Sequence, residues 1–243
     1  MRVKTPLRVT AVSAVLALGL AACGGGDGNG EGGDETTPDA AASPTGQPGG
    51  TYSAELTEPS YLAPASNCYE SECSAVLKMV NDPLVSTNFE TGELEYDGLA
   101  ESIEASEDQT TWTVTLKEGR TFHNGEPVDS ESFLRAWNYS ANPKNAQATA
   151  GFMARIEGAG KGAEMSGLKA IDERTFEVTL SGPFSQFGSM MSYAPAFAPM
   201  AQECMDDLKA CNEAPIGTGP YMMDGQWEHD KGITVTKWDE YQG

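Results

Sequence analysis

Apolar and polar residues alternate along three parts of the chain, residues 102–119, 168–183 and 219–243. The clearest example is the stretch TWTVTLK in the first of them, where every second residue is large and apolar. Such alternation is typical of strands with one buried face, and turn-forming residues interrupt each stretch. The pattern therefore predicts three β-hairpins.

Four other stretches place apolar residues at helical spacing. Residues 71–85 and 127–143 predict the two longest helices, and Asp129 is a suitable N-cap for the second. Residues 184–191 and 200–212 predict short helices.

Two stretches have weaker patterns. Residues 51–66 predict a strand that runs into a proline-rich loop. Residues 158–167, GAGKGAEMSG, are rich in glycine but lack the GK[ST] ending of a phosphate-binding loop, so we interpret them as a surface connection. The elements together predict an α/β fold with mixed sheets and several hairpins.

Residues 1–22 are typical of a secretory signal peptide. Arg2, Lys4 and Arg8 form a basic start, and the apolar run Val9–Leu20 is shorter than the roughly 20 residues that a bilayer span needs. The sequence Leu-Ala-Ala then precedes Cys23. This ending resembles the lipobox of bacterial lipoproteins, in which the cysteine becomes the first residue and carries the lipid. The alternative is an ordinary signal peptide in which Cys23 is incidental.

The sequence after Cys23 supports an anchor. Residues 24–50 contain no aromatic or large aliphatic side chain, so they cannot bury enough apolar surface to offset the entropy of ordering. We therefore predict a disordered tether over residues 23–50. The predicted location is the outer face of the cell membrane, where the protein is held by lipid on Cys23.

The charge of the chain limits its partners. There are 36 acidic and 15 basic residues, and the net charge is −21. Such a balance argues against nucleic acid and against anionic lipid headgroups. A solvated acidic surface on an exported protein is the simplest interpretation.

Four cysteines remain besides Cys23, and they form the local pairs Cys68–Cys73 and Cys204–Cys211. Outside the cytosol such pairs are usually disulfides, and of the three possible connectivities we prefer the local one. Zinc is the alternative. The spacings are not of the CxxC type, however, and both histidines lie far from the pairs in sequence. No metal or cofactor is predicted.

The sequence contains no recognisable catalytic motif. There is no GxSxG elbow, and the acidic residues are too scattered to single out a carboxylate pair. His123 lies beside an Asn-Gly turn signal and is interpreted as a loop histidine that hydrogen-bonds the backbone. The chain is therefore not expected to be an enzyme.

Three stretches resemble the family 5 extracellular solute-binding proteins, the oligopeptide- and dipeptide-binding components of ABC importers. Residues 99–137 contain the family's LAxS turn, its L(K/R)xG strand end and its FH(D/N)G motif before a helix. PIGTGPY at residues 215–221 is similar to the family's glycine-rich approach to a strand, and TEPSYLAPAS at residues 57–66 to its early EPxxLdP loop. Residues 130–132 depart from the family's usual Ala-x-Asp.

The resemblance implies a periplasmic-binding-protein type II-like fold with two lobes around a cleft and a further domain inserted in the first lobe. It places the start of the first lobe at residues 51–66, the inserted domain at 67–176 and the continuation of the first lobe at 177–243. The second lobe is expected to follow Gly243 and to be missing here. The chain as given is therefore expected to be marginally stable and nearly inactive in peptide binding.

The resemblance also implies a function. The expected activity is the capture of an extracytoplasmic solute, an oligopeptide or dipeptide, and its delivery to ABC permease subunits with their ATPases. The alternative is a surface lipoprotein of the same fold that senses peptides or interacts without transport. An enzyme such as a lipoprotein hydrolase is a distant third.

Ligand contacts are expected in the early loop and near one later aromatic residue. Glu58, Pro59, Ser60 and Tyr61 could offer backbone groups to an extended peptide, and Tyr193 follows a predicted short helix. The simpler interpretation is that Tyr61 and Tyr193 are core or interface aromatics.

Overall fold

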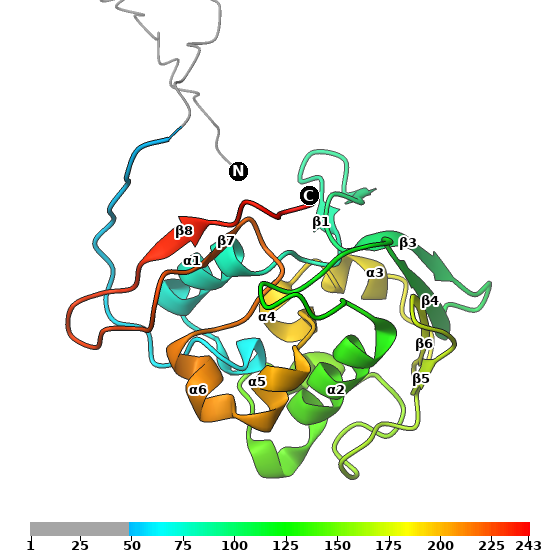
Figure 1. Ribbon diagram of the computed structural model, residues 1–243. Helices are drawn as coiled ribbons and strands as arrows, with labels where there is room; N and C mark the ends of the chain where they lie inside the picture. The colour runs from blue at the N-terminus through cyan, green and yellow to red at the C-terminus, as the bar shows by residue number, and fades with distance from the viewer. Residues whose placement is uncertain (1–48) are drawn as a thin grey trace, which may run out of the picture. The chain divides into compact units, whose positions relative to one another are not determined.

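A four-stranded antiparallel sheet is the largest sheet of the described chain (Figure 1). The computed structural model describes residues 49–243, so the predicted signal peptide, Cys23 and nearly all of the predicted tether lie outside the described residues. The strand order is β3-β4-β6-β5. The strands are β3 (Ala100–Ala105), β4 (Thr111–Leu116), β5 (Leu168–Ala170) and β6 (Thr175–Thr179).

The first two predicted hairpins form this sheet. Strand β3 pairs with β4, and β5 pairs with β6. Between β4 and β6, Trp112 lies opposite Val178 and Val114 lies opposite Phe176, and all four side chains are buried. The apolar alternation in the sequence thus marks the buried face of the sheet, as expected for period-two side chains.

Helix α2 (Ser130–Ala141) packs its apolar side against the core of the sheet. The Phe133 ring stacks on Phe176 with centroids 5.4 Å apart, and the Trp137 ring meets Phe176 edge-on at 5.5 Å. The Asp129 carboxylate accepts a hydrogen bond from the Ser132 N–H at 2.8 Å. Asp129 is therefore the N-cap that the sequence predicts.

The remaining elements are short. The helical ones are η1 (Ala65–Asn67), α1 (Ser71–Val80), η2 (Pro143–Asn145), η3 (Ala150–Met153), α3 (Phe187–Met190), α4 (Ala194–Phe197), α5 (Gln202–Asp206) and α6 (Leu208–Glu213). Two small antiparallel pairs are β1 (Ser86–Thr87) with β2 (Leu94–Glu95) and β7 (Tyr221–Met223) with β8 (Val235–Lys237). The β7–β8 pair is the third predicted hairpin.

Two hydrophobic clusters form the core of residues 53–243. The larger cluster combines the sheet, α2 and the Cys204–Cys211 disulfide. The smaller cluster combines the buried side of α1 with the Cys68–Cys73 disulfide. The two clusters are connected through the chain at residues 62 and 63, because Leu62 belongs to the smaller cluster and Ala63 to the larger one.

Three features differ from the sequence-based expectations. Residues 51–64 form no strand, because no partner strand among the described residues pairs with their backbone. Mixed sheets were expected, but every described strand pair is antiparallel. The reason is that short turns join the strands of each hairpin and reverse the direction of the chain. The expected domain boundary after residue 176 falls inside β6, so the sheet continues across it.

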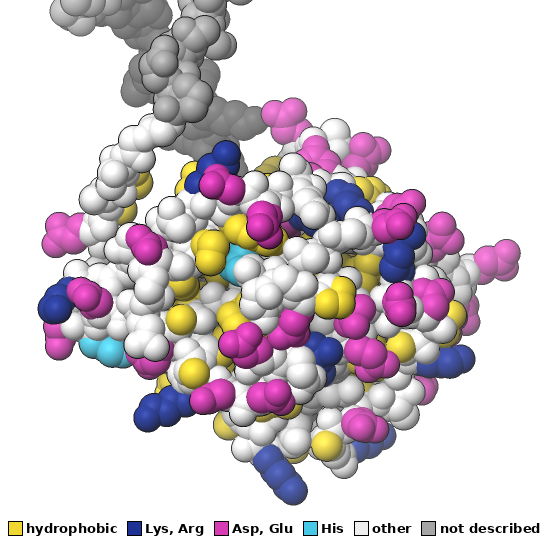
Figure 2. Space-filling view, viewed as in Figure 1, with side chains coloured by type: hydrophobic (Ala, Val, Ile, Leu, Met, Phe, Trp, Pro, Cys, Tyr) yellow, Lys and Arg dark blue, Asp and Glu magenta, His cyan; other side chains and the backbone are white. Residues whose placement is uncertain are grey.

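Acidic side chains are scattered over the surface. In Figure 2, Asp and Glu side chains are spread across the visible face, with fewer Lys and Arg side chains between them. This agrees with the solvated acidic surface expected from composition. Among residues 49–243, no helix is both long enough and apolar enough to cross a bilayer.

Candidate functional site

Residues 58–63, here called the early segment, contain four of the five predicted ligand contacts. No backbone-to-backbone hydrogen bond among the described residues involves this segment. Backbone N–H and C=O groups normally find partners when a chain folds. The segment must therefore be held by side chains, and its other backbone groups have no partner among residues 49–243.

Side chains next to two helices hold the early segment. The Asn212 carbonyl oxygen, in α6, accepts hydrogen bonds from the Leu62 N–H at 2.9 Å and the Ala63 N–H at 3.2 Å. The carboxylate of Glu70, directly before α1, accepts one from the Ser60 N–H. Three backbone N–H groups of the segment are thus bound by side chains.

His229 adds a third attachment. Its ring lies between two carboxylates, with Nδ1 2.8 Å from Glu58 and Nε2 2.9 Å from Glu213. The hydrogen bond to Glu58, followed by that to Glu213, raises the pKa of His229 above its ordinary value of 6.5. A raised pKa favours the charged ring, so the bridge is complete below pH 6.5 and weakens as the pH rises through the folded-state pKa.

Several backbone groups of the early segment have no hydrogen-bond partner among the described residues. The Tyr61 N–H and the carbonyl oxygens of residues 58–63 make no hydrogen bond within the described chain. The Tyr61 side chain is 46 % exposed, while Pro59 is buried. Backbone donors and acceptors without partners are the groups that strand-type peptide recognition uses.

Tyr193 does not belong to this arrangement. Its ring stacks on Phe152, with centroids 4.9 Å apart, and packs against the larger cluster. No described hydrogen bond or aromatic contact joins it to the early segment. Its surroundings favour the simpler interpretation of an aromatic at the edge of the core.

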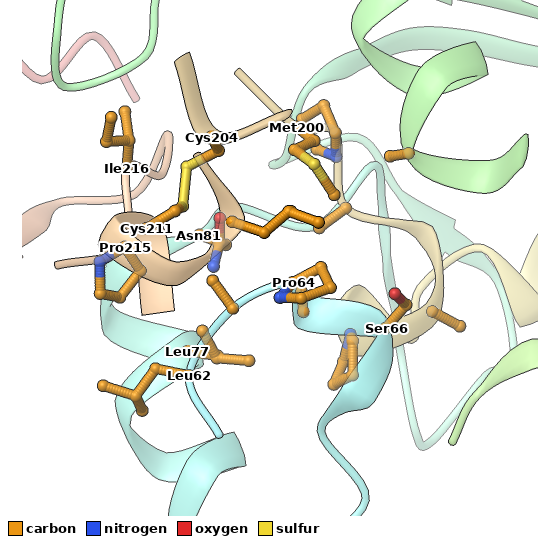
Figure 3. Close-up of a pocket in the computed structure, with 18 residues that line it drawn as sticks. Leu62, Pro64, Ser66, Leu77, Asn81, Met200, Cys204, Cys211, Pro215 and Ile216 are labelled. Atoms are coloured by element: carbon orange, nitrogen blue, oxygen red, sulfur yellow. A yellow bond between two sulfur atoms is a disulfide. The ribbon is translucent and has the colours of Figure 1, made fainter. Parts of the chain in front are cut away.

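A small cavity lies behind the early segment (Figure 3). Leu62 and Pro64 line it together with Leu77 of α1 and the Cys204–Cys211 disulfide. Its volume is about 30 Å³, comparable with the space of a single water molecule. The cavity is therefore a packing gap beneath the segment, too small for a peptide.

A larger hollow lies beside α2 but contains no predicted contact residue. It measures about 440 Å³, and its lining includes Arg135, Asn138, Tyr139 and Glu164. It shares no lining residue with the cavity behind the early segment.

Both local cysteine pairs form disulfides in the structure. The Cα atoms are 5.9 Å apart for Cys68–Cys73 and 5.0 Å apart for Cys204–Cys211. This is the pairing preferred from the sequence. Within residues 49–243, no group of three or more His, Cys, Asp or Glu side chains is arranged to hold a metal ion.

The FHNG and PIGTGPY stretches meet in space, which their separation in sequence does not suggest. The His123 N–H donates to the Gly217 carbonyl oxygen at 2.9 Å, and the Gly217 N–H donates to His123 Nδ1 at 3.2 Å. Nε2 therefore carries the proton and donates to the Gly219 carbonyl oxygen at 3.0 Å. Burial lowers the pKa of His123, so the ring is neutral. The expected loop histidine that binds the backbone is confirmed.

A buried polar network supports the same junction, and no local sequence pattern indicates it. Arg120 and Asp82 form a buried ion pair, and the Tyr241 O–H donates to Asp82 at 2.9 Å. The Asp82 N–H donates to the Thr218 hydroxyl at 3.1 Å. Burial raises the pKa of Asp82 more than its hydrogen bonds to Tyr241 and Arg120 lower it.

Several known proteins are similar to this chain in sequence and in fold. The family described as bacterial extracellular solute-binding proteins, family 5, middle, matches residues 96–243. The chain is 30% identical over 194 residues to the oligopeptide-binding protein OppA of Bacillus subtilis, covering 76% of this chain and 35% of OppA. It is 34% identical over 152 residues to the dipeptide-binding protein DppE of the same organism, covering 59% and 28%.

Solved structures agree with the sequence matches. Haemophilus influenzae OppA in complex with RPPGFSPFR superposes with a TM-score of 0.67 at 26% identity, over 76% of this chain and 37% of that one. The Escherichia coli murein tripeptide binding protein MppA, at 24% identity and a TM-score of 0.66, supports the fold, over 74% and 36%. The expected fold class is thus confirmed, and the chain spans about a third of the length of these relatives.

The relatives also agree with the expectation that the chain is not an enzyme, because the matched family is one of solute-binding proteins. The matched residues 96–243 include the central sheet, α2 and the glycine-rich junction at Gly217. The chain belongs to the bacterial extracellular solute-binding proteins of family 5.

Proposed function

We propose that this chain forms part of an extracytoplasmic protein that captures an oligopeptide or dipeptide and delivers it to an ABC import permease with its ATPase subunits. The observation that carries the proposal is the early segment, which is anchored by side chains and whose carbonyl oxygens make no hydrogen bond within the described chain. The names of OppA and DppE, which bind oligopeptides and dipeptides, support the same class of ligand.

In this proposal the backbone of the early segment forms one wall of the ligand site. An extended peptide would pair with the Tyr61 N–H and neighbouring carbonyl oxygens, and would be selected by its backbone more than by its side chains. The first lobe would comprise residues 51–66 and the chain after β6, with the inserted domain between them. Tyr193 is not needed for this pairing.

The first experiment identifies the ligand. The protein is purified from the cells that produce it, and bound small molecules are released and analysed by mass spectrometry. Short peptides are the expected result. A non-peptide solute at equimolar amount would contradict the proposed ligand class.

The variants Y61P and Y61A separate the backbone of Tyr61 from its ring. Proline removes the N–H that would pair with the ligand, whereas alanine keeps it. Y61P is expected to weaken binding of the co-purified peptide roughly three- to tenfold, the value of one net hydrogen bond, and Y61A is expected to weaken it less. Calorimetry measures both affinities, and equal affinities for Y61P and wild type would argue against backbone recognition here.

We also propose that Cys23 carries the lipid that keeps the protein on the outer face of the membrane. This proposal is based on the Leu-Ala-Ala-Cys sequence after a short apolar run. Cells grown with a clickable palmitate analogue should label the wild-type protein, and C23A should lose the label because the acylated thiol is gone. Equal labelling of C23A would rule out this attachment site.

A further inference from the structure

The two disulfides lie beside the side chains that bind the early segment. Glu70, which accepts the Ser60 N–H, lies inside the Cys68–Cys73 loop. Asn212, which accepts the Leu62 and Ala63 N–H groups, directly follows Cys211. We propose that both disulfides are positioning groups, which fix these side chains and so hold the early segment in place for its ligand.

The first disulfide fixes Glu70 at the start of α1. The bond joins Cys68, before the helix, to Cys73 in its first turn. Without this link, residues 68–70 would be held to the helix only by the chain and by the hydrogen bond from the Ser74 N–H to the Glu70 carbonyl oxygen, so the Glu70 carboxylate would be less firmly placed. The Ser60 N–H depends on that carboxylate, because it makes no other hydrogen bond in the described chain.

The second disulfide fixes the orientation of α6. Helix α5 has 5 residues and α6 has 6, and helices this short are not stable by themselves in water. The Cys204–Cys211 bond joins one to the other. Asn212 therefore depends on the disulfide for its position, and so does Glu213, which holds His229 and through it Glu58.

Packing leads to the same conclusion. Leu62 is in the hydrophobic cluster of the first disulfide, and Ala63 is in the cluster of the second. Leu62 is fully buried, and none of the four cysteines is more than 5 % exposed. Both bonds are thus shielded from reductants in solution, as expected of permanent positioning groups rather than redox switches.

Amide hydrogen exchange tests the inference on the full protein. The variants C68A/C73A and C204A/C211A replace each pair with small apolar residues. Exchange at Ser60 is expected to accelerate about tenfold in the first variant, and exchange at Leu62 and Ala63 by a similar factor in the second, since each amide loses its bound acceptor. Exchange within β4 should change much less, because no described hydrogen bond joins that strand to either disulfide loop.

Matched single variants separate the hydrogen-bond acceptor from its surroundings. E70A and N212A keep both disulfides, remove the acceptor oxygen, and should accelerate exchange at Ser60 and at Leu62 and Ala63, respectively. The controls are E72A, in the first disulfide loop, and K209A, on the exposed side of α6; neither side chain has a described hydrogen bond, and neither variant should alter exchange.

The outcomes are distinct. If a double-cysteine variant retains the slow exchange of β4 and leaves the early segment unchanged, that disulfide is not a positioning group and the inference is wrong for it. If such a variant does not fold, the same measurement is made on the corresponding serine variant, C68S/C73S or C204S/C211S, and the same criteria apply.

The part of this inference that concerns ligand binding rests on the proposed function, whereas the positioning of the early segment by the disulfides does not. The affinity of each variant is therefore measured with a library of synthetic dipeptides to pentapeptides. Faster exchange with weaker peptide binding supports both ideas. Faster exchange with unchanged binding leaves the disulfides as positioning groups and overturns the proposed role of the early segment in ligand binding.

Discussion

Replacing Arg120 by alanine is expected to lower the free energy of unfolding by about 3–5 kcal/mol, the cost of breaking a buried ion pair. Arg120 and Asp82 are each 6 % exposed. In R120A the Asp82 carboxylate would stay buried with the Tyr241 hydroxyl but without the cation that pairs with it. Urea denaturation followed by circular dichroism measures the loss.

Two variants serve as controls for R120A. Lys231 lies 3.6 Å from Glu228 in an exposed pair, so K231A should cost less than about 1 kcal/mol. D82N/R120M removes both charges and should be less destabilised than R120A, because no uncompensated charge remains. A loss below about 1 kcal/mol for R120A would show that the pair does not support this junction.

Gly217→Ala is expected to destabilise the protein by about 3 kcal/mol, at the upper end of the range for overpacking. A methyl group at this position would lie 2.0 Å from the Val80 carbonyl oxygen and 2.8 Å from Asn81 Oδ1. The Val80 contact is with backbone, which cannot rotate away as a side chain could. The displacement would also strain the two hydrogen bonds between Gly217 and His123.

Gly162→Ala is the matched control for this prediction. No heavy atom lies within 4 Å of the added methyl group, so the expected change is within about 0.5 kcal/mol. Both free energies come from the same urea titration. If the two variants lost similar amounts of unfolding free energy, this would contradict the claim that close packing against α1 requires glycine at position 217.

Local sequence patterns were sufficient for the features that depend on neighbouring residues. The alternation in β4 predicted a buried sheet face, and Asp129 predicted the start of α2, because both signals lie within a few residues of the structure they describe. The pairing of Cys68 with Cys73 could also be predicted from local sequence, because the two cysteines are only five positions apart. His123 was predicted to bind backbone, although the partners Gly217 and Gly219 could not be named.

The early segment shows where such patterns fail. Residues 51–66 were predicted to be a strand that runs into a loop, but a strand needs a partner, and the groups that hold the early segment are side chains. Asn212 lies 150 positions from Leu62 in the chain, and nothing near either residue indicates the other. Tyr241 and Asp82, 159 positions apart, were missed for the same reason. The two-residue strands β1 and β2 are too short to show periodicity.

The central claim is that the early segment binds peptide through its backbone, and the exchange rate of the Tyr61 amide tests it most directly. This N–H makes no hydrogen bond within the described chain. The full protein is compared with and without saturating peptide from the synthetic library. Strand-type pairing predicts that exchange at Tyr61 slows about tenfold or more while exchange in β4 is unchanged. Saturating peptide that leaves the Tyr61 rate as it was would contradict the claim.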